Sequence, residues 1–134
     1  MPVVKSLVIA SDFAAARTAE DAVLGEVSRL GYGKSSLFAI KLAMEEGLNN
    51  AIRHGNALDP HKTVHLKYEV RPDRIIIEIA DQGAGFDPQG VPDPTADENL
   101  EKPSGRGIML MRAYMDEVRF SRDGRHLRMV KRKA

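Results

Sequence analysis

Apolar and polar residues alternate along the chain with two different periods, and the period separates strands from helices. Residues 64, 66, 68 and 70 are apolar with polar residues between them, which predicts a strand over 63–70. A second strand is predicted over 74–80, and the turn residues 71–73 between them make the pair a hairpin. A short strand of β-branched and apolar residues is predicted over 3–9.

Helical spacing predicts two longer helices between these strands. The first runs from a cap at Ser11 or Asp12 to about Leu30. Its expected inward residues are Phe13, Val23, Val27 and Leu30. The second opens at Ser35 or Ser36 and runs to about His54, where Gly55 supplies the stop. Its apolar residues step by three and four and are Leu37, Ile40, Met44, Leu48 and Ala51.

The C-terminal part predicts a short helix and a second hairpin. The helix follows Gly105-Arg106-Gly107 and ends near Met115, and strands over 118–121 and 127–130 meet at a turn around 123–124. The element order is therefore β-α-α-β-β-loop-α-β-β. Because helices do not alternate strictly with strands, we expect an α+β two-layer sandwich with an antiparallel or mixed sheet. We expect one domain over 1–134.

Residues 87–104 interrupt this pattern with a proline-rich segment that has few apolar residues. It holds four of the seven prolines and is 18 residues long. Structureless loops longer than about 12–15 residues are uncommon inside compact domains. We therefore expect 87–104 to be a mobile lid or a disordered segment.

Composition excludes several classes of protein. The 134 residues include no cysteine, so disulfides, thiolate metal sites and cysteine nucleophiles are excluded. No apolar run approaches the roughly 18 residues of a membrane span, and the N-terminus lacks the apolar core of a secretory signal. We expect a soluble, cytoplasmic protein with no membrane partner.

The formal net charge of +1 conceals an uneven distribution. From Arg119 onward the chain has seven Lys or Arg and one acidic residue, which leaves 13 bases and 18 acids in the first 118 residues. A basic C-terminal hairpin can bind nucleic acid. Because this hairpin has little aromatic content, a solvated sheet face or a patch for an acidic protein is the favoured interpretation. We expect no direct nucleic-acid binding.

Three segments carry polar residues or glycines in arrangements suited to ligand chemistry. Glu46 and Asn50 are four residues apart and share a helix face, as a general base and an oxygen ligand for a hard metal would. Asp81 follows a strand and precedes glycines, so its carboxylate and the backbone could approach one ligand. Gly105 and Gly107 precede a helix, where N–H groups attract phosphate. Taken singly, each has a structural alternative: a solvent-facing helix side, a strand-to-loop turn, and a chance GxG.

The three segments together, in this order, resemble the GHKL or Bergerat-fold ATPases over essentially the whole chain. Residues 42–55 (LAMEEGLNNAIRHG) resemble the N box, and 81–86 (DQGAGF) resemble the G1 box. Residues 104–118 (SGRGIMLMRAYMDEV) resemble the G2 box in its small-protein form. The His-Gly and Met-Asp-Glu-Val sequences are most similar to the branch of anti-sigma factor/serine-protein kinases, the RsbW and SpoIIAB type. The resemblance implies a mostly antiparallel mixed sheet with helices on one face.

The resemblance also implies site residues. Glu46 matches the catalytic base that activates a serine hydroxyl or water, and Asn50 matches the Mg²⁺ ligand. Asp81 matches the carboxylate that reads the adenine amino group of ATP. The glycines that shape the nucleotide site, with the adjacent arginine that would add charge near the phosphates, are Gly83, Gly85, Gly105, Arg106 and Gly107. Glu45 is expected to be an outward neighbour of Glu46.

The activity implied by the resemblance is an ATP- and Mg²⁺-dependent serine protein kinase that doubles as an anti-sigma factor. Such a protein sequesters a sigma factor, phosphorylates a serine on a small antagonist of the STAS type, and is usually a homodimer. The alternative is a nucleotide-gated binding module with little or no kinase activity. A base at Glu46 favours the kinase, because a pure binding module does not need one.

Overall fold

The computed structural model describes residues 3–83, 105–122 and 124–133. The elements are β1 (Val3–Ala10), α1 (Phe13–Arg29), α2 (Lys34–Asn49), the π-helix η1 (Asn50–Gly55), β2 (Thr63–Val70), β3 (Arg74–Ala80), α3 (Gly105–Tyr114), β4 (Glu117–Ser121) and β5 (His126–Arg132). The expected lid over 87–104 lies outside the described residues, so it stays a prediction.

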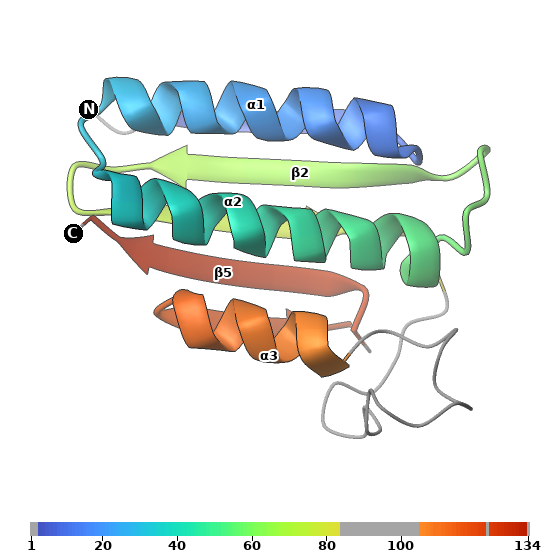
Figure 1. Ribbon diagram of the computed structural model, residues 1–134. Coiled ribbons are helices and arrows are strands. Elements are labelled where there is room, and N and C mark those ends of the chain that lie inside the picture. The colour runs from blue at the N-terminus through green and yellow to red at the C-terminus, as the bar shows by residue number, and fades with distance from the viewer. Residues whose placement is uncertain (1–2, 84–104, 123, 134) are drawn as a thin grey trace.

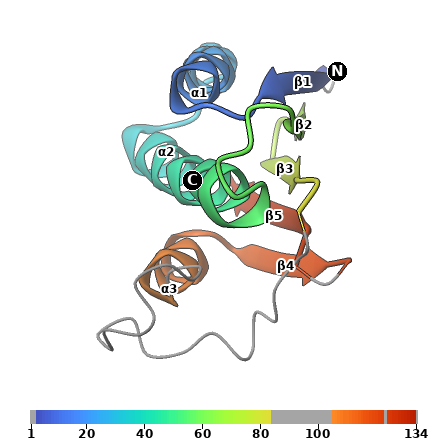
Figure 2. The same cartoon turned by 90° about the vertical axis from the view of Figure 1, so that its right-hand side faces the viewer.

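The sheet has five strands in the order β1-β2-β3-β5-β4, and every neighbouring pair is antiparallel. Both predicted hairpins, β2–β3 and β4–β5, are present. The three helices lie side by side along one face (Figure 1), and the view from the end shows a helix layer against a sheet layer (Figure 2). The predicted α+β two-layer fold is confirmed.

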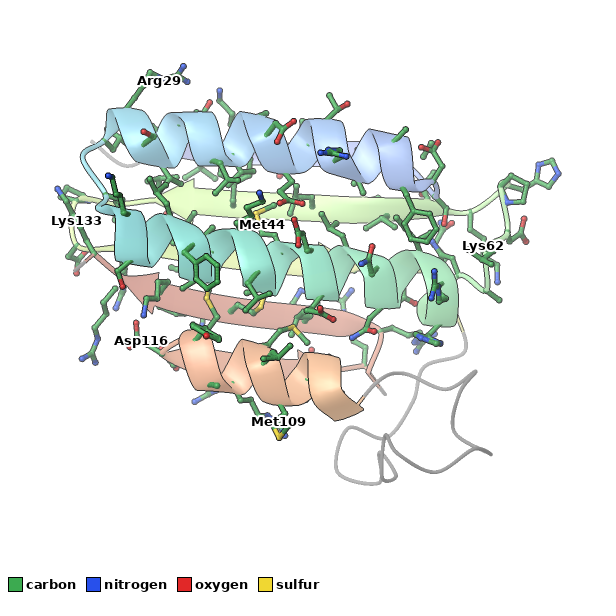
Figure 3. All side chains as sticks on the ribbon, in the orientation of Figure 1. Arg29, Met44, Lys62, Met109, Asp116 and Lys133 are labelled. Carbon is green, nitrogen blue, oxygen red and sulfur yellow. The ribbon has the colours of Figure 1, made fainter. Side chains whose placement is uncertain are left out.

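The core fills the space between the two layers. The alternating apolar residues of β2 are all buried, as their spacing predicts: Val64, Leu66, Tyr68 and Val70. They pack in one cluster with residues of the helices, including Val23 of α1 and Met44 of α2 (labelled in Figure 3). Because β2 and β3 alternate inward and outward, one sheet face is left for polar residues. The predicted alternation of the strand over 63–70 is confirmed.

The face of the sheet opposite the helices carries much of the C-terminal positive charge. Arg119 of β4 pairs with Arg128 of β5, which pairs with Glu78 of β3, so these side chains share one row across the sheet. Lys67 of β2 continues the row. The basic hairpin thus lies on a sheet face that is not covered by the described helices. No helix in the described part of the chain is long and apolar enough to cross a membrane.

The ends of the helices differ from the predictions. Phe13 and Leu30 were expected to face inward, but they are 42% and 40% exposed because they lie at the two ends of α1, beyond the sheet core. Asp12 is the cap of α1, with its carboxylate accepting the N–H of Ala15 at 2.7 Å. The second helix begins at Lys34 after an extended Gly33, so neither Ser35 nor Ser36 is its cap.

The C-terminal end of α2 changes into a π-helix over Asn50–Gly55. Short π segments inside or after α-helices often occur at functional sites. The helical segment ends at Gly55, as predicted, but the left-handed backbone lies further on, at Ala57 (φ 52°) and Leu58 (φ 60°). The role of Gly55 is a close approach described below.

Candidate nucleotide site

The predicted site residues meet at one end of the molecule. The end of α2, the end of β3, the start of α3 and the β4–β5 turn all lie at the right-hand end of Figure 1, which faces the viewer in Figure 2. A narrow pocket there is lined by Gly47, Asn50, Ala51, Ile79, Asp81, Phe120, Gly124, Arg125 and Leu127. Asn50 and Asp81, which are 31 residues apart in sequence, therefore line the same pocket. Its volume of about 10 Å³ holds about one water molecule, so a nucleobase requires rim side chains to move.

One backbone and one side-chain hydrogen bond hold Asp81 in position. Its backbone N–H donates to the carbonyl of Arg125 at 2.9 Å, which ties the end of β3 to the β4–β5 turn. Its Oδ1 accepts the N–H of Gly83 at 2.8 Å. Burial raises the pKa of Asp81, and the Gly83 N–H and the charges of Arg125 and Lys62 oppose this rise. The other carboxylate oxygen remains an acceptor for a ligand N–H.

Two glycines bring Asp81 against the helix end. A Cβ on Gly55 would lie 2.3 Å from Cγ of Asp81, and a Cβ on Gly83 would lie 1.6 Å from the carbonyl oxygen of Gly55. Both distances are far below van der Waals contact, so neither position admits a side chain in this packing. The predicted role of Gly83 in shaping the wall agrees with this geometry. The role of Gly55 was missed, because its sequence context indicated only a helix stop.

A third glycine lets α2 approach the floor of the pocket. A Cβ on Gly47 would lie 2.9 Å from Cδ1 of Ile79 and 3.0 Å from Cδ2 of Leu127. Glycine in a helix interior costs about 1 kcal/mol relative to alanine, so close packing is the physical reason for its presence here. The approach places the Asn50 turn of the helix directly beside β3 and β5.

Asn56 fixes the segment that follows Asp81 and was not predicted. It is fully buried, and its Nδ2 donates to the carbonyl of Thr63 at 2.9 Å and to Oγ of Ser11 at 3.2 Å. Its Oδ1 accepts the N–H of Gln82 at 2.8 Å. One side chain thus connects the helix end, β2 and the G1-like segment. An asparagine after His-Gly is typical of an ordinary loop, so the sequence contained no signal for this role.

Glu46 of α2 lies one helical turn before Asn50, the first residue of η1, and Asn50 lines the pocket. Asn50 is 9% exposed, and its Nδ2 has no hydrogen-bond partner within the described residues. A buried, unpartnered amide is costly unless a ligand or water satisfies it. Glu46 is half-buried, and its pKa is raised first by burial and then by the negative charge of Glu45. A carboxylate with a raised pKa is a stronger base than an exposed one.

Glu45 was expected to point outward, and that expectation is wrong. Its carboxyl group lies in the groove between α1 and α2, close enough to Glu20 to raise the pKa of the Glu20 carboxyl group. Glu20 is 6% exposed, and its pKa is raised to about 7, mainly by burial and then by Glu45. Successive residues on a helix are turned by about 100°, so Glu45 and Glu46 face opposite flanks of α2.

The predicted phosphate-facing glycines lie at the start of α3. The helix begins at Gly105, so Gly105 and Gly107 belong to its first turn rather than to a loop before it. The ring of Phe38, near the start of α2, contacts the ring of Tyr114, at the end of α3, with 5.6 Å between centroids. The two helices are therefore antiparallel, and the start of α3 lies toward the Asn50 end of α2 (Figure 1). Gly85 and the side chain of Arg106 lie outside the described residues.

The residues present fit an adenine nucleotide with a metal ion. Asp81 offers an acceptor, the unpartnered amide of Asn50 offers a polar group, and the first turn of α3 offers N–H groups. Within the described residues no group of three or more His, Cys, Asp or Glu could hold a metal ion. A Mg²⁺ ion at this site would take Oδ1 of Asn50 and phosphate oxygens of the nucleotide as ligands, and the unpartnered Nδ2 of Asn50 could donate to a ligand oxygen.

Comparison with known proteins agrees with this geometry. The chain is 35% identical over 107 residues to the serine-protein kinase RsbW of Bacillus licheniformis, covering 74% of this chain and 66% of that protein. It is 33% identical to RsbW of Bacillus subtilis, covering 71% and 63%, and 31% identical to the serine/threonine-protein kinase BtrW of Bordetella bronchiseptica, covering 72% and 71%. The chain thus spans just under two thirds of the length of these RsbW relatives.

The fold has a solved counterpart. The crystal structure of the RsbU and RsbW domains of Rv1364c from Mycobacterium tuberculosis matches with a TM-score of 0.65 and 18% identity, covering 97% of this chain and 31% of that one. The family model for the histidine kinase-like ATPase domain matches residues 9–131. The resemblance seen in the motifs is confirmed: this chain belongs to the family of histidine kinase-like ATPase domains.

Proposed function

We propose that this chain is an ATP- and Mg²⁺-dependent serine protein kinase that also acts as an anti-sigma factor. The observation that supports it most directly is the meeting of Asn50 and Asp81 in one pocket, with Glu46 one helical turn before Asn50. The serine-protein kinases among its relatives favour the same activity. Loss of nucleotide binding on changing Asp81 would be the simplest sign that the pocket is the nucleotide site.

Each residue of the proposed site has a distinct task. Asp81 accepts a hydrogen bond from the adenine amino group, and Oδ1 of Asn50 would be a ligand of Mg²⁺. The resemblance assigns Gly105, Gly107 and the charge of Arg106 to the phosphates, and it assigns Gly83 and Gly85 to the wall beside the base. Mg²⁺ supplies charge neutralisation for the phosphates when it is bound.

Glu46 is the proposed catalytic base. Its carboxylate accepts the proton of the substrate serine hydroxyl as the serine oxygen forms a bond to the γ-phosphorus. The bond between that phosphorus and the β–γ bridging oxygen breaks, and ADP leaves with the electron pair. The raised pKa of Glu46 brings it closer to the operating pH, which strengthens it as a base while it remains a proton acceptor.

The proposed partners are a sigma factor and a small STAS-type antagonist whose serine receives the phosphate. Because sigma factors act on RNA polymerase, the proposal places the protein in the cytoplasm. The homodimer implied by the resemblance stays a prediction, which light scattering of the purified chain would test.

The deciding experiment uses Glu46→Gln, which keeps the shape of the side chain and removes the proton acceptor. We expect transfer of labelled phosphate to a copurified antagonist to fall about 10²–10⁴-fold, while nucleotide affinity stays near wild type. Glu117→Gln, an exposed carboxylate of β4, is the matched control and should transfer at the wild-type rate. Asn50→Ala should lose Mg²⁺-dependent ATP binding together with activity. Equal rates for Glu46→Gln and wild type would exclude Glu46 as the base.

A further inference from the structure

Arg125 lies at the rim of the nucleotide pocket and is not part of any motif in the sequence. It is the residue after Gly124 in the β4–β5 turn, and both line the pocket together with Asp81. Its carbonyl accepts the N–H of Asp81, so the backbone of the two residues is in direct contact at 2.9 Å. Its side chain is exposed, and its charge acts on the Asp81 carboxylate strongly enough to oppose the rise in the pKa of Asp81.

The guanidinium of Arg125 is only partly used by the protein. Its Nε donates to the carbonyl of Arg122 at 3.0 Å, which holds the side chain beside the turn. Within the described residues the group forms no salt bridge of 4.0 Å or less, so it lies near Asp81 without pairing with it. A guanidinium has five N–H donors in a rigid fork, and within the described residues no hydrogen bond is formed by the two terminal nitrogens, so their N–H groups can meet a ligand.

The two side chains offer opposite hydrogen-bonding chemistry at one pocket. An ionised Asp81 only accepts and Arg125 only donates. Adenine has an amino donor beside ring-nitrogen acceptors. Its amino group can donate to the Asp81 carboxylate, and a ring nitrogen can accept one N–H of the Arg125 guanidinium. Guanine has O6 and N7 acceptors that match an arginine fork, and its N1–H and N2–H₂ donors match a carboxylate. The pair therefore complements both purines.

The apolar part of the lining does not discriminate between purines. Ile79, Phe120 and Leu127 supply apolar surface from β3, β4 and β5, and each purine ring packs equally well on such a surface. Arg125 is also the long exposed side chain at the rim of a pocket that is too narrow for a base as it stands. A base that enters this pocket therefore lies within reach of the Arg125 guanidinium.

We propose that Arg125 is a second base-reading residue and that, with Asp81, it makes this site accept guanine as well as adenine nucleotides. The inference rests on the proposed function, because it assumes that the nucleotide binds in the Asp81 pocket. It extends that function by assigning the base specificity to a residue of the β4–β5 turn.

The test is calorimetric titration of the purified chain with Mg-ADP and Mg-GDP, which measures binding without phosphotransfer. Wild type should bind the two nucleotides within about tenfold of one another. Arg125→Ala should weaken GDP about 10- to 150-fold, the range for one or two charge-assisted hydrogen bonds, and ADP at most about fivefold. Arg128→Ala is the matched control, because it removes the same charge from β5 on the sheet face that lies opposite the helices. It should change neither affinity by more than about twofold.

The outcomes separate this inference from the proposed function. Wild type that binds ADP but rejects GDP more than about 100-fold overturns the inference alone. So does an Arg125→Ala variant that weakens both nucleotides equally or weakens neither. Wild type that binds neither nucleotide overturns the proposed function and this inference with it. Asp81→Asn should weaken both nucleotides, which would locate both in the same pocket.

Discussion

The carboxyl pair of the buried Glu20 and the half-buried Glu45 makes the stability of this protein depend on pH in a defined window. The pKa of Glu20 is about 7 in the folded chain and 4.5 without the fold. Below pH 4.5 Glu20 is protonated in both states, and its O–H can donate to Glu45. As the pH rises from 4.5 to 7, the unfolded chain releases this proton before the folded chain does. Stability from this group is therefore fully present below the lower value and is lost as pH passes the higher one.

The size of the effect follows from the difference in pKa. One pKa unit corresponds to about 1.4 kcal/mol, so this group should lower the free energy of unfolding by about 3 kcal/mol between pH 4.5 and pH 8. The charged groups that face the pair are Arg17 and Asp21 of α1 and Lys41 of α2, which also line the groove. Lys41 lowers the pKa of Glu20 and Asp21 raises it, and both effects are smaller than that of burial.

The perturbation is Glu20→Gln, because the carboxamide can donate to Glu45 and has no proton to lose. The variant should match wild type near pH 5 and exceed its stability increasingly toward pH 8, by up to about 3 kcal/mol or about 10 °C in Tm. Urea unfolding at pH 5, 6, 7 and 8 measures the difference directly. Glu117→Gln changes an exposed carboxylate of β4, away from the groove, and should shift stability by less than about 0.5 kcal/mol at every pH. A pH-independent difference between Glu20→Gln and wild type would refute the shared-proton account.

Two further predictions concern the nucleotide side of the helix. Gly55→Ala should displace Asp81, weaken nucleotide binding at least tenfold and cost about 1–3 kcal/mol of stability, as judged by titration and urea unfolding. Gly25→Ala is its control, since a Cβ there meets nothing within 4 Å and should stabilise α1 slightly. Glu45→Gln should lower the pKa of Glu46, so the acid limb of the pH profile of phosphotransfer should move to lower pH. An unmoved limb would show that Glu45 does not tune Glu46.

The sequence predicted most reliably where local pattern alone determines the structure. The bounds of β2 and β3 agree with the prediction. The strict alternation along β2 and the Pro-Asp turn after it allow one pairing register, and this register buries both Val64 and Ile77. The helix ends were predicted less well. Periodicity gives the side of α1 that faces the sheet, but it does not show that the sheet ends before Phe13.

The candidate site was predictable to the extent that its residues belong to motifs. Asn50 and Asp81 were expected in one site, and they line one pocket. Gly55, Asn56 and Arg125 were missed because each acts across a tertiary contact that a linear pattern does not contain. Gly55 is needed where two segments approach, Asn56 where three segments meet, and Arg125 where a turn borders the pocket.

The misassignment of Glu45 has a physical consequence for the proposed kinase. Because Glu45 and Glu46 face opposite flanks of α2, the helix separates the carboxyl pair from the nucleotide pocket while the charge of Glu45 still raises the pKa of Glu46. Glu20→Gln keeps that charge and removes the proton, whereas Glu45→Gln removes the charge. The first change should therefore alter stability without moving the acid limb of phosphotransfer, and the second should move the limb. If both variants moved the limb equally, the coupling would run through helix packing rather than through charge.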